Sequence, residues 1–182
     1  MMTNLNPLNI IFVEDSITDM ELAVRELRKH GIKLNTVRVE TELDFLAALK
    51  NNPPDLVISD YRLPGFDGMS ALKLSLGHNP NLPFIILTGA MNEIIAVECM
   101  KAGATDYVIK EHMTRLPFAV QEALDQAKSR QAIEEAEEQL KDSQWALDKA
   151  QEIARIGSWT MNRRTGIEKW SNQLYRLLGI TP

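Results

Sequence analysis

The sequence predicts an α/β fold with a doubly wound parallel sheet. Five short apolar runs recur along the first two thirds of the chain, and each is followed by a segment whose apolar residues recur at helical spacing. The runs are apolar on both faces, as in strands that helices cover on either side of a sheet. Because strands that alternate with helices form parallel βαβ units, we expect five parallel strands with helices on both faces.

The five apolar runs mark the expected strands. They lie at residues 9–13, 35–39, 56–59, 84–87 and 107–109. After the first run, Met20, Ala23 and Leu27 recur at the spacing of one helix face, and Leu43 and Leu46 do so after the second. These positions predict the helices that bury the sheet.

The composition is that of a soluble globular protein. Of the 182 residues, 45% are hydrophobic and 25% are charged, and no apolar run approaches the roughly 18 residues of a membrane span. Because the N-terminus has neither a basic nor an apolar leader region, we expect a cytoplasmic protein with no membrane partner. Cys99 is the single cysteine, which excludes an internal disulfide framework and a cysteine-based zinc cluster. The net charge of −5 belongs to residues 1–111, and this argues against nucleic acid as a direct partner.

Polar side chains follow four of the five expected strands. Glu14 and Asp15 follow the first strand, Asp60 the third, Thr88 the fourth and Lys110 the fifth. In open α/β sheets, ligands bind beyond the carboxyl ends of the strands, so we expect these five side chains to converge on one edge. Three neighbouring carboxylates repel one another without a cation, and their hard oxygen donors suit Mg²⁺.

Asp60 is the expected reactive group at this edge. A carboxylate can act as a nucleophile that forms an aspartyl-phosphate, and Mg²⁺ can bridge that carboxylate to a phosphoryl oxygen. Lys110 and Thr88 would supply charge and hydrogen bonds to the phosphoryl oxygens. A single Asp after a strand is more often an ordinary loop residue, so the interpretation depends on the other four positions.

Four motifs in residues 8–125 resemble the receiver domain of two-component response regulators. They are Glu14-Asp15, the stretch D-Y-R-L-P-G-F-D-G at 60–68, L-T-G at 87–89 and K-A-G-A-T-D-Y-V-I-K at 101–110. The resemblance implies a flavodoxin-like receiver fold. It also implies that Asp60 accepts a phosphoryl group from the phosphohistidine of a histidine kinase or of a phosphotransfer protein.

The same resemblance implies roles for the neighbouring residues. Mg²⁺ is expected on Asp15, Asp60 and the main-chain carbonyl of Arg62, with Glu14 acting through water. Thr88 and Tyr107 resemble the family's switch pair, in which the hydroxyl turns toward the phosphoryl group and the aromatic ring swings inward. The added phosphoryl charge would thereby bias a two-state surface.

Two positions depart from the family's pattern. Glu111 stands where receivers commonly have a proline after the active-site lysine, with a cis peptide before it. A cis bond without proline costs about 2.5–4 kcal/mol, so we expect the Lys110–Glu111 linkage to be either strained or trans. Arg62, two residues after Asp60, occupies a position that influences dephosphorylation in this family. We hypothesise that its side chain shields the acyl phosphate from water.

From about Arg115 the sequence predicts one long helix. Its apolar residues fit an a/d heptad seam, which indicates a parallel helix from a second copy, although packing on its own domain is the open alternative. The seam comprises Ile133, Ala136, Leu140, Leu147, Ala150 and Ala154, with Ser143 as a polar interruption. The final segment resembles the beginning of a PAS domain, but about 30 residues are too few to bury a core or form a ligand pocket.

We therefore expect a receiver domain at 1–125, a helical coiled-coil linker at 126–153 and a PAS-like fragment at 154–182. The chain would accept a phosphoryl group rather than turn over a metabolite. A small-phosphate hydrolase needs D-x-D after the first strand, where E-D-S-I-T stands instead. A phosphorylation-independent interaction module remains open, as does a regulatory part of a histidine kinase or diguanylate cyclase.

Overall fold

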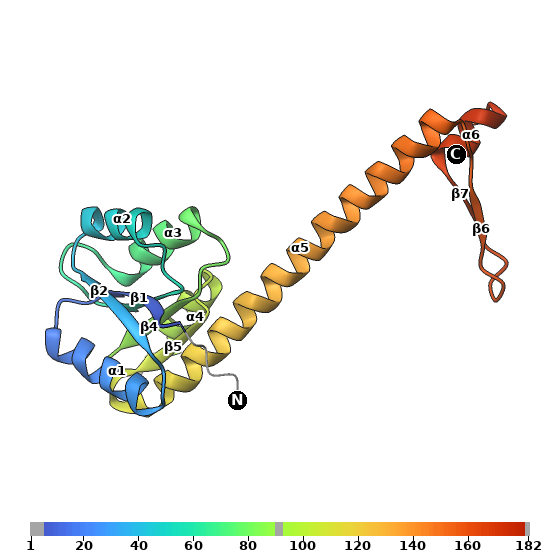
Figure 1. The fold of residues 1–182 in the computed structure, drawn as a ribbon. Helices are drawn as coiled ribbons and strands as arrows, with labels where there is room; N and C mark the ends of the chain where they lie inside the picture. Colours follow the sequence, from blue (N-terminus) through green and yellow to red (C-terminus); the bar gives the residue numbers. More distant parts are fainter. Residues whose placement is uncertain (1–5, 90–92, 181–182) are drawn as a thin grey trace. The chain divides into compact units, whose positions relative to one another are not determined.

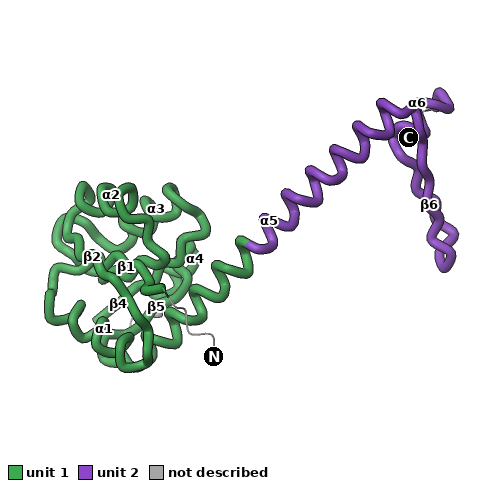
Figure 2. The backbone as a smooth tube through the Cα atoms, viewed as in Figure 1, with its two compact units in different colours: residues 1–131 green, residues 132–182 purple. Residues whose placement is uncertain are grey.

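The computed structural model describes residues 6–89 and 93–180. It consists of two compact units, residues 1–131 and residues 132–182 (Figure 2). Unit 1 contains a five-stranded sheet with helices on both faces, and unit 2 contains the second part of a long helix, a short hairpin and a final helix. None of the helices in the described part of the chain combines the length and the apolar character that a membrane span requires.

The sheet of unit 1 is parallel throughout and has the strand order β2-β1-β3-β4-β5 (Figure 1). Its strands are β1 (Leu8–Val13), β2 (Leu34–Val39), β3 (Leu56–Asp60), β4 (Phe84–Thr88) and β5 (Asp106–Ile109). The predicted fold class is confirmed. Because the order of the strands reverses between β1 and β3, the crevice that such sheets use for ligands opens at their carboxyl ends.

The helices of unit 1 cover the sheet in two layers. They are α1 (Ile17–Lys29), α2 (Glu42–Asn51), α3 (Gly68–His78), α4 (Glu93–Lys101) and the first turns of α5 (Leu116–Ala154). Ile10 and Phe12 point to the layer of α1 and α5, whereas Ile11 and Val13 point to the layer of α2, α3 and α4. This alternation along one apolar strand explains why the expected strands show no polar face.

Polar side chains fix where the first three helices begin. Ser16, Thr41 and Asp67 are the N-cap residues of α1, α2 and α3, and each side chain accepts a hydrogen bond from the backbone N–H three residues later. These caps satisfy donors that the first helical turn leaves free. Ser16 therefore starts α1 directly after Glu14 and Asp15, which keeps those two carboxylates in the loop at the end of β1.

The predicted long helix is present as α5, but a 3-10 helix (Lys110–Arg115) precedes it, which the sequence analysis did not anticipate. Leu116, Val120 and Leu124 are buried against the sheet of unit 1.

The rest of unit 2 comprises β6 (Trp159–Met161), β7 (Glu168–Trp170) and α6 (Asn172–Leu178), with β6 and β7 antiparallel. Within unit 2, Arg176 pairs with Glu152 of α5 at 3.4 Å.

Candidate functional site

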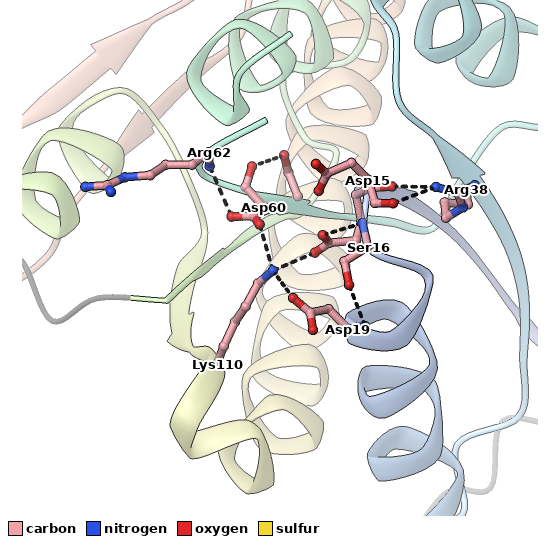
Figure 3. A network of polar contacts seen from close by, with 9 residues as sticks. Asp15, Ser16, Asp19, Arg38, Asp60, Arg62 and Lys110 are labelled. Carbon is pink, nitrogen blue, oxygen red and sulfur yellow. Dashed lines mark hydrogen bonds and ion pairs between the residues drawn. The ribbon is translucent and has the colours of Figure 1, made fainter. Parts of the chain in front are cut away.

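One ammonium joins three carboxylates at the carboxyl ends of the strands (Figure 3). Lys110 Nζ donates to Glu14 Oε2 at 2.9 Å, to Asp19 Oδ2 at 2.6 Å and to Asp60 Oδ2 at 2.7 Å. Glu14 follows β1, Asp60 ends β3 and Lys110 follows β5. The parallel sheet thus brings together residues that lie up to 96 positions apart in the chain.

Burial and charge act on this cluster in opposite directions. Burial raises the pKa of Glu14, and the hydrogen bond from Lys110 only partly opposes that rise. For Lys110, burial alone would lower the pKa, but the hydrogen bonds to Asp19, Asp60 and Glu14 outweigh it and raise the pKa of Lys110 above its ordinary value. Lys110 therefore stays charged and serves as the internal counter-ion of the site.

The carboxylates also fit a divalent cation. One oxygen from each of Glu14, Asp15 and Asp60 lies within 4.8 Å of the other two. Since Lys110 contacts Glu14, Asp60 and Asp19 but supplies one positive charge, the carboxylates outnumber the ammonium. Hard oxygen donors with excess negative charge are what Mg²⁺ requires, so the residues present fit this ion.

The loop that carries Glu14 and Asp15 is held from two sides. Arg38 of β2 donates through Nη1 to the main-chain oxygens of Glu14 at 3.1 Å and Asp15 at 3.3 Å (Figure 3). Inside the loop, the Ser16 N–H donates to Glu14 Oε1 at 3.1 Å. The carboxylate of Glu14 is thereby oriented by Ser16 on one oxygen and by Lys110 on the other.

The loop after Asp60 turns back over the end of β3. The Arg62 N–H donates to Asp60 Oδ1 at 3.0 Å, and the Gly68 N–H donates to the carbonyl of Tyr61 at 3.2 Å. A Cβ on residue 68 would lie 2.5 Å from the main-chain oxygen of Asp60, so this close approach requires glycine. The side chain of Arg62 extends away from the carboxylate of Asp60 (Figure 3).

Thr88 ends β4, whereas Tyr107 is the second residue of β5 and pairs with Ile86. In the sheet register Asp60 is opposite Leu87, so Thr88 is one residue beyond the neighbour of Asp60, opposite Ile109. Tyr107 is half-buried in β5. The guanidinium of Arg115 lies 5.7 Å from the centre of the Tyr107 ring and donates to the Tyr107 main-chain oxygen at 2.7 Å.

The Lys110–Glu111 peptide is trans, because the described part of the chain contains no cis peptide bond. Of the two possibilities that the sequence left open, the structure has the one that avoids the cost of a cis bond without proline. Lys110 nevertheless reaches Asp60, since its four-carbon stem is flexible enough to place the ammonium from a trans backbone.

Two residues of the site were not anticipated from the sequence. Asp19 lies in the first turn of α1. An acidic residue is common there because its negative charge interacts favourably with the positive end of the helix dipole. Arg38 is the penultimate residue of β2, whereas the five predicted site residues follow the expected strands directly. The available signal for Arg38 was its charge inside an apolar strand that ends at the same edge as β1 and β3.

Comparison with known proteins agrees with this geometry. Residues 10–121 match the model of the response regulator receiver domain family. The chain belongs to that family. Receivers take phosphoryl groups from histidine kinases and bind Mg²⁺ at an acidic pocket, which corresponds here to the cluster of Glu14, Asp15 and Asp60.

Similar curated receivers occur in longer regulators. The chain is 35% identical over 115 residues to the DNA-binding transcriptional regulator NtrC of Salmonella typhimurium, which is 63% of this chain and 23% of that protein. It is 34% identical over 116 residues to the regulatory protein LuxO of Vibrio vulnificus, covering 63% of this chain and 25% of that protein. The chain thus spans about a quarter of the length of these relatives.

Solved structures show the same receiver fold. A putative response regulator from Chloroflexus aurantiacus matches with a TM-score of 0.60 and 28% identity over 66% of this chain and 99% of its own. NtrX from Brucella abortus matches with a TM-score of 0.64 and 26% identity over 72% of this chain and 30% of its own.

Proposed function

We propose that this chain is a phosphoacceptor module of a two-component system, with Asp60 as the residue that becomes phosphorylated. The observation that carries the proposal is the contact of Asp60 Oδ2 with Lys110 Nζ at 2.7 Å beside the Glu14, Asp15 and Asp60 cluster. A phosphorylation-independent module has no need of a nucleophile, a counter-ion and a carboxylate cluster in one place. All three are present here, which favours a receiver that accepts a phosphoryl group over a module that signals without phosphorylation.

In the proposed reaction, one oxygen of Asp60 attacks the phosphorus of a phosphohistidine on a histidine kinase or phosphotransfer protein. The P–N bond breaks and its electron pair stays with the imidazole, which leaves. Asp15, Asp60 and the main-chain carbonyl of Arg62 would hold Mg²⁺, with Glu14 acting through water, and the ion would supply positive charge next to the phosphoryl oxygens. Lys110 and Thr88 would contact those oxygens, and Thr88 with Tyr107 would carry the change to the surface.

Intact-mass measurement after incubation with acetyl phosphate and Mg²⁺ tests this proposal. We expect a gain of one phosphoryl group in the wild-type chain, no gain without Mg²⁺, and no gain in Asp60→Asn. Asp55→Asn is a matched control, because Asp55 is an exposed carboxylate just before β3 that bonds the Asn9 N–H away from the site. No gain in the wild type, or an equal gain in Asp60→Asn, would contradict the proposal.

We further propose the organisation of receiver at 1–125, helical linker at 126–153 and PAS-like fragment at 154–182. In this organisation the helical linker mediates a homodimer. The seam residues Ile133, Leu140 and Leu147 are 59%, 58% and 58% exposed, and a helix with such an apolar stripe gains stability from a partner. A second copy supplies that partner without any other protein.

Sedimentation equilibrium tests the linker. We expect a dimer for the wild-type chain and a monomer for the double variant Leu140→Glu/Leu147→Glu, whereas Lys141→Glu, outside the seam, should remain dimeric. A wild-type chain that stays monomeric at every concentration would refute the dimer but leave the phosphoacceptor role intact.

We infer that the receiver unit has no direct nucleic-acid partner. The Salmonella relative is named as DNA-binding, but this chain matches only 23% of that protein. The excess charge of residues 1–111 is acidic, which opposes binding to phosphates.

A further inference from the structure

Asp19 does not perform the local task that its position suggests. It is the third residue of α1 after the N-cap Ser16. In a capping box, an acidic side chain at this position accepts the N–H of the N-cap residue. Here the Ser16 N–H donates to Glu14 Oε1 instead, and the carboxylate of Asp19 points to Lys110 Nζ at 2.6 Å (Figure 3).

The three acceptors of Lys110 are not equivalent. An ammonium has three donors, and each reaches a different carboxylate, on Glu14, Asp19 and Asp60. Glu14 and Asp60 belong to the cluster that fits a divalent cation. Among these three acceptors, Asp19 alone lies outside that cluster, so its charge remains available to Lys110 when the cluster holds an ion.

Phosphoryl transfer changes one acceptor of Lys110 and leaves Asp19 as it was. When an oxygen of Asp60 forms the bond to phosphorus, its carboxylate becomes a neutral acyl group and the charge moves to the phosphoryl oxygens. Lys110 must then follow those oxygens without leaving the site. The four-carbon stem of lysine is flexible, so the ammonium does not stay in one position unless a second charge holds it.

We propose that Asp19 is a positioning residue, which holds the ammonium of Lys110 beside Asp60 while the phosphoryl group is transferred. This inference rests on the proposed function, because it assigns Lys110 a part in the transfer. Asp19 is a residue of α1, whereas Lys110 follows β5. The ion pair between Asp19 Oδ2 and Lys110 Nζ at 2.6 Å therefore connects the first helix to the reacting centre.

The test is the phosphorylation rate of the full chain with acetyl phosphate at saturating Mg²⁺. In this step the P–O bond of the donor breaks and acetate leaves with the electron pair. We expect Asp19→Asn to react about tenfold more slowly than the wild type, since misplacement of a catalytic group costs one to two orders of magnitude in rate. Asp19→Glu keeps the charge and should recover part of the rate lost in Asp19→Asn. Asp19→Gln has a side chain as long as that of glutamate but no charge, so it should not recover the rate.

Two further measurements separate positioning from other roles. Glu21→Gln removes an exposed carboxylate from the same helix and should leave the rate unchanged. The Mg²⁺ dissociation constant, measured by calorimetry, should change by less than about threefold in Asp19→Asn, because Asp19 lies outside the cluster of Glu14, Asp15 and Asp60. A role limited to helix stability would lower the melting temperature of Asp19→Asn without changing its rate at saturating Mg²⁺.

An Asp19→Asn variant that reacts as fast as the wild type or faster would overturn the inference. A faster rate would mean that Asp19 only repels the anionic donor. If Asp19→Glu and Asp19→Gln react equally slowly, the charge of residue 19 is irrelevant and the inference also fails. A wild-type chain that gains no phosphoryl group would instead refute the proposed function.

Discussion

Replacing Lys110 by methionine tests the charge balance of the site. The variant removes the ammonium that three carboxylates share at 2.6–2.9 Å. Losing one partner of a buried ion pair costs about 3–5 kcal/mol, because an unpaired charge remains. Lys110 and Asp60 keep side-chain exposures of 18% and 13%, so water screens part of this loss. Without Mg²⁺ we expect the free energy of unfolding to fall by about 2–3 kcal/mol.

Mg²⁺ should reduce the difference in unfolding free energy between Lys110→Met and the wild type. An ion that binds only the folded state stabilises it by about 2.7 kcal/mol at one hundred times its dissociation constant. The variant presents the same carboxylates without the competing ammonium, so it should bind Mg²⁺ more tightly and gain more stability. We expect the difference in unfolding free energy to shrink to about 1 kcal/mol at saturating Mg²⁺.

Hydrogen exchange measured by mass spectrometry in increasing urea suits this prediction. All three tryptophans lie in unit 2, at 145, 159 and 170, so their fluorescence does not report on unit 1. Peptides from β1 and β3 report its global unfolding, because core strands exchange last. Lys73→Met, at an exposed lysine of α3, is the matched control. Equal stability of Lys110→Met and the wild type without Mg²⁺ would refute the reasoning, and so would a difference that Mg²⁺ leaves unchanged.

The raised pKa of Lys110 adds a pH dependence to the same comparison. The unfolded chain loses the Lys110 proton around pH 10.5, whereas the folded state keeps it to higher pH. The stability that Lys110 contributes is therefore complete below this pH and is lost as the pH rises further. We expect wild-type stability to decrease with pH in that range and the decrease to be weaker in Lys110→Met, measured by urea unfolding at several alkaline pH values.

Three further substitutions give separate tests. Gly68→Ala should lower the free energy of unfolding by about 1–3 kcal/mol, because its Cβ would meet the Asp60 main-chain oxygen. Urea unfolding followed by hydrogen exchange measures this. Gly77→Ala in the same helix has open space around its Cβ and should instead raise the free energy of unfolding, by up to about 1 kcal/mol. Arg38→Met should weaken Mg²⁺ binding in calorimetry, because the Glu14 and Asp15 loop loses its anchor; tighter binding would mean that Arg38 acts only as a repelling charge. The Arg62 side chain extends away from Asp60 (Figure 3), so Arg62→Asn should leave the lifetime of phosphorylated Asp60 unchanged; a faster decay of the phosphorylated mass would instead support shielding by the arginine.

Much of the site follows from a one-dimensional pattern. The residues at the ends of β1, β3, β4 and β5 could be located because parallel strands share a direction, so their last residues meet at one edge. Glu14, Asp15, Asp60, Thr88 and Lys110 can all be located from the sequence in this way. The metal that suits the cluster also follows from the residue types, since carboxylates favour hard cations.

Asp19 and Arg38 could not be located in the same way. Asp19 reads as an ordinary acid in the first turn of a helix, and its contact with Lys110 depends on how the start of α1 lies over the end of β5. Arg38 contributes through hydrogen bonds to two main-chain oxygens, and the packing of β2 beside β1 decides which oxygens it reaches. Both contacts arise from the packing of elements far apart in the chain.

The sequence by itself determined the alternation of strands and helices, the edge where the polar residues gather and the long helix after it, because hydrophobic periodicity and strand direction are local properties. The tertiary structure decided which carboxylates share Lys110, because only packing sets the distance from α1 and β2 to the strand ends. It also decided that the Lys110–Glu111 peptide is trans. The charge balance around Asp60 is therefore a property of the fold, although each charge can be read from the sequence.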